Sequence, residues 1–83
     1  MSVERARRAW VRAVNAHLRA ARSHETAAEL FAGFQDARLA HRESELAAAE
    51  RDAYATEIAR HPDWADDVRM SPPAPAATRP LKP

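Results

Sequence analysis

The stretch Val3–Phe31 reads VERARRAWVRAVNAHLRAARSHETAAELF, and its spacing decides the expected fold. Two series of residues with a seven-residue period run through it, three residues apart. The first series is Val3, Trp10, His17, His24 and Phe31, and the second is Ala6, Ala13, Ala20, Ala27 and Phe34. Residues seven apart lie on one face of an α-helix. The stretch therefore predicts one long amphipathic helix.

This first helix is expected over residues 3–32. Ser2 is a suitable N-cap, and Glu4 places an acid in the first turn, where the helix dipole favours it. Ser23 offers a second cap that would divide the stretch, but the first series passes through His24 without a change of phase. One continuous helix is therefore favoured. Its expected inward face carries Val3, Trp10, Val14, Ala21, Ala28 and Phe31, with Leu18 at the edge. Its expected outward face carries Arg5, Arg8, Arg12, Asn15 and Arg19.

The apolar pattern changes phase after Phe31. Continuing the first series by sevens gives Arg38, Glu45, Asp52 and Ala59, whereas the apolar stripe of the second half is Leu39, Leu46, Ala53, Tyr54 and Ile58. One straight helix cannot keep both stripes against one partner. We therefore expect a turn over residues 33–36, with Gly33 at the C-terminal cap and Asp36 as the next N-cap.

A second helix is expected over residues 37–60, ending before Pro62, because the residue before a proline disfavours helical geometry. The short connection makes the two helices antiparallel neighbours. In that arrangement His17 falls near Ala53 and His24 near Leu46. The series Glu43, Glu50 and Glu57 would then meet the histidines at the edge of the seam.

The C-terminal part divides into two segments. Residues 63–70 are expected to form a short helical turn, with Trp64 and Val68 on one face and Trp64 within reach of Trp10. Residues 71–83 hold five of the six prolines and are expected to be a disordered tail. The predicted fold is all-α: an antiparallel two-helix hairpin, a short C-terminal helical turn and a Pro-rich tail.

Composition narrows the class of protein. The chain has 83 residues and therefore at most one domain, with a net charge of only +1. It has no cysteine, which excludes disulfides and thiolate metal sites and fits a reducing compartment. No segment stays apolar for the ~18 residues of a membrane span, and arginines interrupt the N-terminal region, unlike in a signal peptide. We expect a cytoplasmic protein.

Neither catalysis nor a cofactor is expected. Glu-x-x-His, the ligand motif of carboxylate-bridged metal sites in bundles, is absent. His17 and His24 are separated by about 10.5 Å along a helix, too far to share one ion. The serines lack a Gly-rich turn or a nearby base, and one glycine is too few for a phosphate-cradling loop. We therefore expect no metal and no small-molecule substrate.

An interaction module is the function that remains. So small a chain buries only a modest fraction of its surface and is usually marginally stable alone. Such chains are commonly stabilised by self-association or by binding a partner helix. The expected partner-binding residues are Trp10, Val11, Val14, Leu18, Phe31, Leu39, Leu46, Tyr54 and Ile58. Val11 and Leu18 lie toward one edge of the seam and Phe31 toward the other, so a second hairpin would complete a four-helix bundle. The alternative is nucleic-acid binding through Arg5, Arg8, Arg12 and Arg19.

Overall fold

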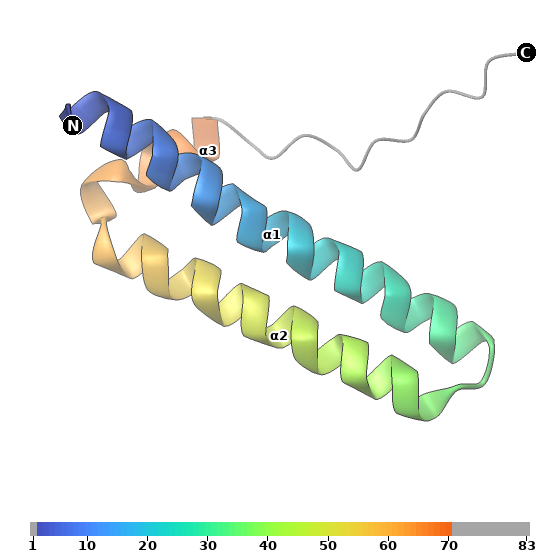
Figure 1. The fold of residues 1–83 in the computed structure, drawn as a ribbon. Coiled ribbons are helices and arrows are strands. Elements are labelled where there is room, and N and C mark those ends of the chain that lie inside the picture. The colour runs from blue at the N-terminus through green and yellow to red at the C-terminus, as the bar shows by residue number, and fades with distance from the viewer. Residues whose placement is uncertain (1, 71–83) are drawn as a thin grey trace, which may run out of the picture.

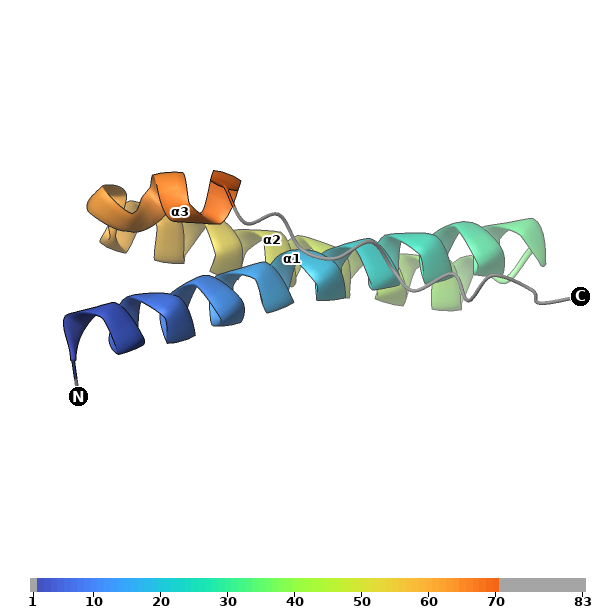
Figure 2. The same ribbon diagram turned by 90° about the horizontal axis from the view of Figure 1, so that it is seen from above.

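The computed structural model describes residues 2–70 of the chain. The elements are α1 (Val3–Gly33), α2 (Ala37–Arg60), the 3-10 turn η1 (Pro62–Trp64) and α3 (Ala65–Met70). Figure 1 shows α1 and α2 running antiparallel, side by side. Figure 2 shows α3 folded back over one side of this pair. The expected all-α hairpin with a short C-terminal helical turn is confirmed, while the expected tail, residues 71–83, lies outside the described residues.

Local capping explains where both long helices begin. The Ser2 hydroxyl accepts a hydrogen bond from the Arg5 amide at 3.2 Å, and the Asp36 carboxylate accepts one from the Leu39 amide at 3.1 Å. Each bond satisfies one of the amides that the first turn of a helix leaves unpaired. α1 continues through Ser23 without interruption, and α2 ends at Arg60, two residues before Pro62.

The turn corrects the role expected for Gly33. Gly33 is the last residue of α1, and the left-handed conformation falls on Gln35, with φ at 59°. The Asp36 amide donates to the Phe31 carbonyl at 2.9 Å and the Gln35 amide to the Ala32 carbonyl at 3.0 Å, the two bonds of a Schellman motif. Because the amide of Phe34 still donates to the Leu30 carbonyl, at 3.1 Å, the helix continues through Gly33.

The buried core of one chain is small. The buried apolar residues of the described part are Val14, Ala21, Ala47 and Val68. Val14 and Ala21 come from α1 and Ala47 from α2, so small side chains line the seam between the two long helices. Small side chains allow the backbones of α1 and α2 to approach closely.

Two residues lie on a different side from the one expected. Asn15, placed on the outward face, is 5% exposed, and Val3, placed on the inward face, is 72% exposed. The expected faces counted two helices only, whereas α3 packs on α1 as a third element. Val3 lies one heptad before Trp10, which pairs with Glu57, so its counterpart would fall beyond Arg60, where α2 has ended. Burial at these positions depends on where the other elements begin and end.

An aromatic cluster and an ion pair hold the open end of the hairpin together. The rings of Trp10 and Trp64 meet edge-on at 5.7 Å, and His61 stacks on Trp64 at 4.6 Å. Trp64 thus reaches Trp10, as expected. Arg7 binds the Asp67 carboxylate through both its Nε and Nη2 atoms, the latter at 2.9 Å. The hydrogen bond from Arg7 lowers the pKa of Asp67.

Among residues 2–70, no helix combines the length and the apolar character needed to cross a membrane.

Candidate interaction surfaces

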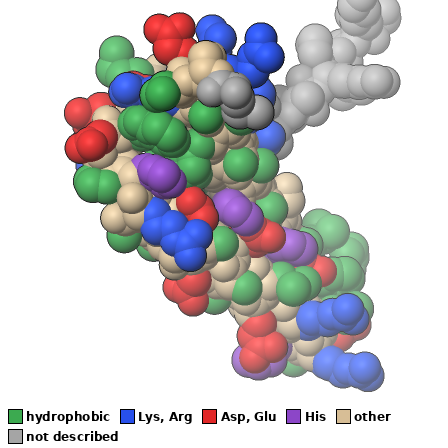
Figure 3. Space-filling model, turned by 60° about the vertical axis from the view of Figure 1, so that its left-hand side comes forward, with side chains coloured by type: hydrophobic (Ala, Val, Ile, Leu, Met, Phe, Trp, Pro, Cys, Tyr) green, Lys and Arg blue, Asp and Glu red, His purple; other side chains and the backbone are tan. Residues whose placement is uncertain are grey.

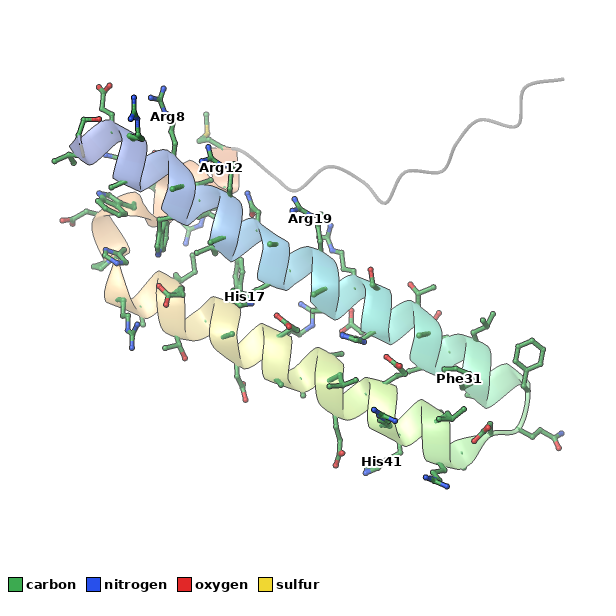
Figure 4. The ribbon with its side chains drawn as sticks, in the orientation of Figure 1. Arg8, Arg12, His17, Arg19, Phe31 and His41 are labelled. Atoms are coloured by element: carbon green, nitrogen blue, oxygen red, sulfur yellow. The ribbon has the colours of Figure 1, made fainter. Side chains whose placement is uncertain are left out.

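Three pairs of side chains, spaced by seven residues, cross the seam along one edge. Trp10 Nε1 donates to Glu57 Oε2 at 3.0 Å. His17 Nδ1 lies 2.6 Å from Glu50 Oε2, and His24 Nδ1 lies 2.5 Å from Glu43 Oε2. We call these three pairs the seam row. Figure 3 shows histidines beside acidic side chains along one face of the hairpin, and Figure 4 shows His17 between α1 and α2.

The hydrogen bonds of the seam row favour a particular alignment of α1 against α2. An ionised carboxylate only accepts hydrogen bonds, so each imidazole donates from Nδ1. Because the pairs recur every seven residues on both helices, sliding one helix by a turn would break all three at once. A slide by seven residues would re-form only two pairs of the same kind, so the row excludes shifts by one turn and favours the observed alignment by one further pair.

Other chemistry at the row is not supported by its geometry. Within residues 2–70, no three candidate metal ligands come together. A hollow between α1 and α3 is lined by Glu4, Arg7, Arg8 and Asp67, but Arg7 and Asp67 already bind each other there. Neither place offers a nucleophile with a base beside it.

The opposite edge of the seam carries one further pair. Arg51 donates from Nε and Nη2 to the two carboxylate oxygens of Glu25, at 2.8 and 2.7 Å. This hydrogen-bonded pair lowers the pKa of Glu25 and raises that of Arg51. Both side chains are close to half exposed, so the contribution to stability is small, in the range of a surface ion pair.

The expected partner-binding residues fall into four environments. Val14 is fully buried in the seam, and Trp10 belongs to the aromatic cluster. Leu46 is 39% exposed. The half-buried remainder is Val11, Leu18, Phe31, Leu39, Tyr54 and Ile58. At 100° per residue, Val11, Leu18 and Ile58 lie on the side of the Glu25–Arg51 pair, and Phe31, Leu39 and Leu46 on the side of the seam row.

Sequence reasoning left two exposed apolar residues out of this set. Leu30 is 59% and Phe34 73% exposed, both at the turn end of the hairpin. Leu30 lies on the side of α1 away from α2, and Phe34, the last residue of the second seven-residue series, lies in the turn just after α1, so neither belongs to the inward stripe. Bulky apolar side chains on an outward face are the signal that would have identified them.

The four arginines of the expected nucleic-acid surface share one environment. Arg5, Arg8, Arg12 and Arg19 are all exposed, and none of them forms an ion pair with another residue of the described part, 2–70. Figure 4 shows Arg8, Arg12 and Arg19 on the side of α1 that faces away from α2. By contrast, the four arginines Arg7, Arg51, Arg60 and Arg69 each bind a carboxylate.

Comparison with protein-family models finds no match to the chain, and comparisons with curated proteins and with solved structures find none either. The proposals for function therefore rest on the geometry of the two helices and their surfaces.

Proposed function

We propose that this chain is a small, non-enzymatic helical interaction module whose hairpins associate with one another into a helical bundle. The supporting observation is the imbalance between what one chain buries and what it leaves at the edges of its seam. Within residues 2–70, two of the four buried apolar residues are alanines, while larger side chains such as Leu18, Tyr54 and Ile58 stay half-buried.

The energetics favour covering those side chains. Fully burying a Leu or Ile side chain is worth roughly 1.5–3 kcal/mol relative to leaving it in water. A half-buried side chain has realised only part of this gain, and several lie along each edge of the seam. A second hairpin brings the same residues to the same surface, which makes an isologous contact self-complementary in apolar character.

A second copy is the occupant we favour over an unrelated helix. Each edge of the seam already presents α1 and α2 side by side, so a second pair of helices completes a four-helix bundle with ordinary packing geometry.

We propose a cytoplasmic location for the module. The chain contains no cysteine, so its fold does not depend on disulfides and is compatible with a reducing compartment.

Sedimentation velocity at micromolar concentration tests the proposal. The wild-type protein should sediment as a dimer or a larger assembly. Leu18→Glu should sediment as a monomer, because an unpaired charge buried in the shared surface costs several kcal/mol. The matched control is Ala16→Glu, which makes the same change of charge at an exposed position of α1 and should leave the assembly intact. A folded wild-type monomer that is indifferent to Leu18→Glu would overturn self-association.

A further inference from the structure

We infer that the outer face of α1 binds the phosphate backbone of nucleic acid through Arg5, Arg8, Arg12 and Arg19. These four residues form what we call the arginine stripe. Figure 4 shows Arg8, Arg12 and Arg19 on the side of α1 turned away from α2, and Arg5 shares their helical phase, so the stripe remains available when a second hairpin packs at the edge of the seam. The inference does not depend on self-association.

The geometry of the stripe is that of a linear track. At 100° per residue the four positions fall within an arc of about 60° around α1. At 1.5 Å per residue, Arg5 and Arg19 are separated by roughly 21 Å along the axis. One strand of duplex DNA carries a phosphate about every 3.4 Å of axis. A backbone crossing or following α1 therefore offers phosphates to several guanidinium groups at once.

The charge of the stripe is available to a ligand. None of its four arginines has a carboxylate partner among residues 2–70, so binding a phosphate breaks no ion pair there. The first 23 residues contain six arginines and a single acid, Glu4, although the whole chain carries only +1. The positive charge is therefore concentrated on this part of α1. The guanidinium fork also suits phosphate, which it can bind through two parallel hydrogen bonds.

The residues beside the stripe favour nucleic acid over a membrane. A helix lying on a bilayer inserts bulky apolar side chains next to its cations. By helical phase, small residues flank the stripe on one side, Ala9, Ala16 and Ser23, and polar residues flank it on the other, Asn15 and Arg22. The apolar side of α1 is occupied by α2 instead, with Val14 and Ala21 fully buried. The exposed apolar residues Leu30 and Phe34 lie beyond the stripe, 11 and 15 residues after Arg19 at the turn end of the hairpin. Along its own length the stripe thus supplies cations without an anchor for lipid.

Fluorescence anisotropy with a labelled 20-nucleotide single strand and a labelled 20-base-pair duplex tests the inference. If four phosphates are neutralised, the logarithm of the binding constant should fall with the logarithm of salt with a slope of about −3.6 for duplex and about −2.8 for single strand. Between 50 and 200 mM NaCl, duplex binding should weaken on the order of 100-fold.

Two variants with equal net charge separate the stripe from general charge. Replacing Arg12 and Arg19 by Gln together should weaken binding at least tenfold and reduce the salt slope to about half, because about two of four phosphate contacts remain. The control replaces Arg38 and Arg42 by Gln, both exposed, outside α1 and in no ion pair within residues 2–70, and should bind like the wild type. Gln and Arg have similar helix propensities, and circular dichroism checks that both variants fold.

Three outcomes would overturn the inference. The first is no binding of either probe at 50 mM NaCl. The second is an equal loss of binding in the stripe variant and the control variant. The third is binding to vesicles containing phosphatidylserine with no binding to nucleic acid, which would make the stripe a lipid-facing surface.

Discussion

At the scale of single residues, hydrogen bonds across the seam set the alignment of the hairpin. His17 and Glu50 meet although they are 33 residues apart, and His24 and Glu43 repeat the contact one heptad away. These side chains are partly exposed, so each bond stabilises the fold modestly, by about 1 kcal/mol. Their larger effect is to select the alignment of the two helices, because a shift by one turn breaks all three pairs of the row and a shift by seven residues re-forms only two.

A double-mutant cycle tests this alignment. His17→Ala combined with Glu50→Ala should show a coupling energy of about 1 kcal/mol in urea unfolding, because the two residues are in contact. His17→Ala combined with Glu43→Ala is the matched control, and the two effects should add, because Glu43 binds His24 instead. Equal coupling in both cycles would mean that the helices are not held in this register.

The turn offers a second test at single positions. Gly33→Ala should raise the free energy of unfolding by roughly 0.5–1 kcal/mol, because Gly33 is helical and its added Cβ would meet no atom within 4 Å. Gln35→Gly should also stabilise, because Gln35 holds a left-handed conformation that glycine adopts without strain. Chemical denaturation measures both. A loss of stability in Gly33→Ala would mean that Gly33, and not Gln35, holds the left-handed conformation at the end of α1.

At the scale of elements, α3 is attached to α1 by an ion pair and an aromatic cluster. Asp67 binds Arg7, and Trp64 packs against Trp10. α3 is only six residues long, too short to be helical alone. Its position therefore depends on these tertiary contacts, and losing the ion pair should loosen the whole segment.

Acid should release α3. The pKa of Asp67 is lowered by its hydrogen bond from Arg7, so the ion pair contributes stability at pH values above the ordinary range of an aspartate and loses it as pH falls through the lowered pKa. Tryptophan emission should therefore shift to the red below about pH 4.

A variant separates this effect from general acid unfolding. Asp67→Asn should show a red shift already at pH 7, whereas the control Glu25→Gln removes the Arg51 pair, far from both tryptophans along the chain, and should not. Identical emission of Asp67→Asn and the wild type at pH 7 would show that α3 is held by its apolar contacts alone.

Local signals and long-range contacts were not equally readable from the sequence. Ser2, Asp36 and Pro62 act within a few residues, and they predicted where the long helices begin and where α2 ends. The periods of the histidines and glutamates likewise predicted that they meet. Contacts such as Arg7–Asp67, which join residues 60 apart, have no periodic signal. The burial of Asn15 depends on the packing of a third element, and the left-handed conformation of Gln35 depends on the geometry of the turn. Neither the position of Asn15 around an isolated helix nor the presence of Gly33 in the sequence could predict these two features.

At the scale of the whole molecule, α1 has two faces with different roles. Its inner face packs on α2, and half-buried side chains at the edges of the seam are the surface we propose for a second hairpin. Its outer face carries the arginine stripe. Since the two faces are separate, an assembly of two hairpins would present two stripes, and a long nucleic acid that spans both would bind more tightly than to one.

The concentration dependence of thermal unfolding tests the proposed self-association most directly. If the folded state is an assembly and the unfolded chain is a monomer, mass action stabilises the fold as protein concentration rises. We predict that Tm, followed by circular dichroism at 222 nm, the wavelength of the helical signal, increases steadily from ~1 to ~100 µM protein. A Tm that stays constant across this range would show that the hairpin is stable as a monomer and would contradict the proposal.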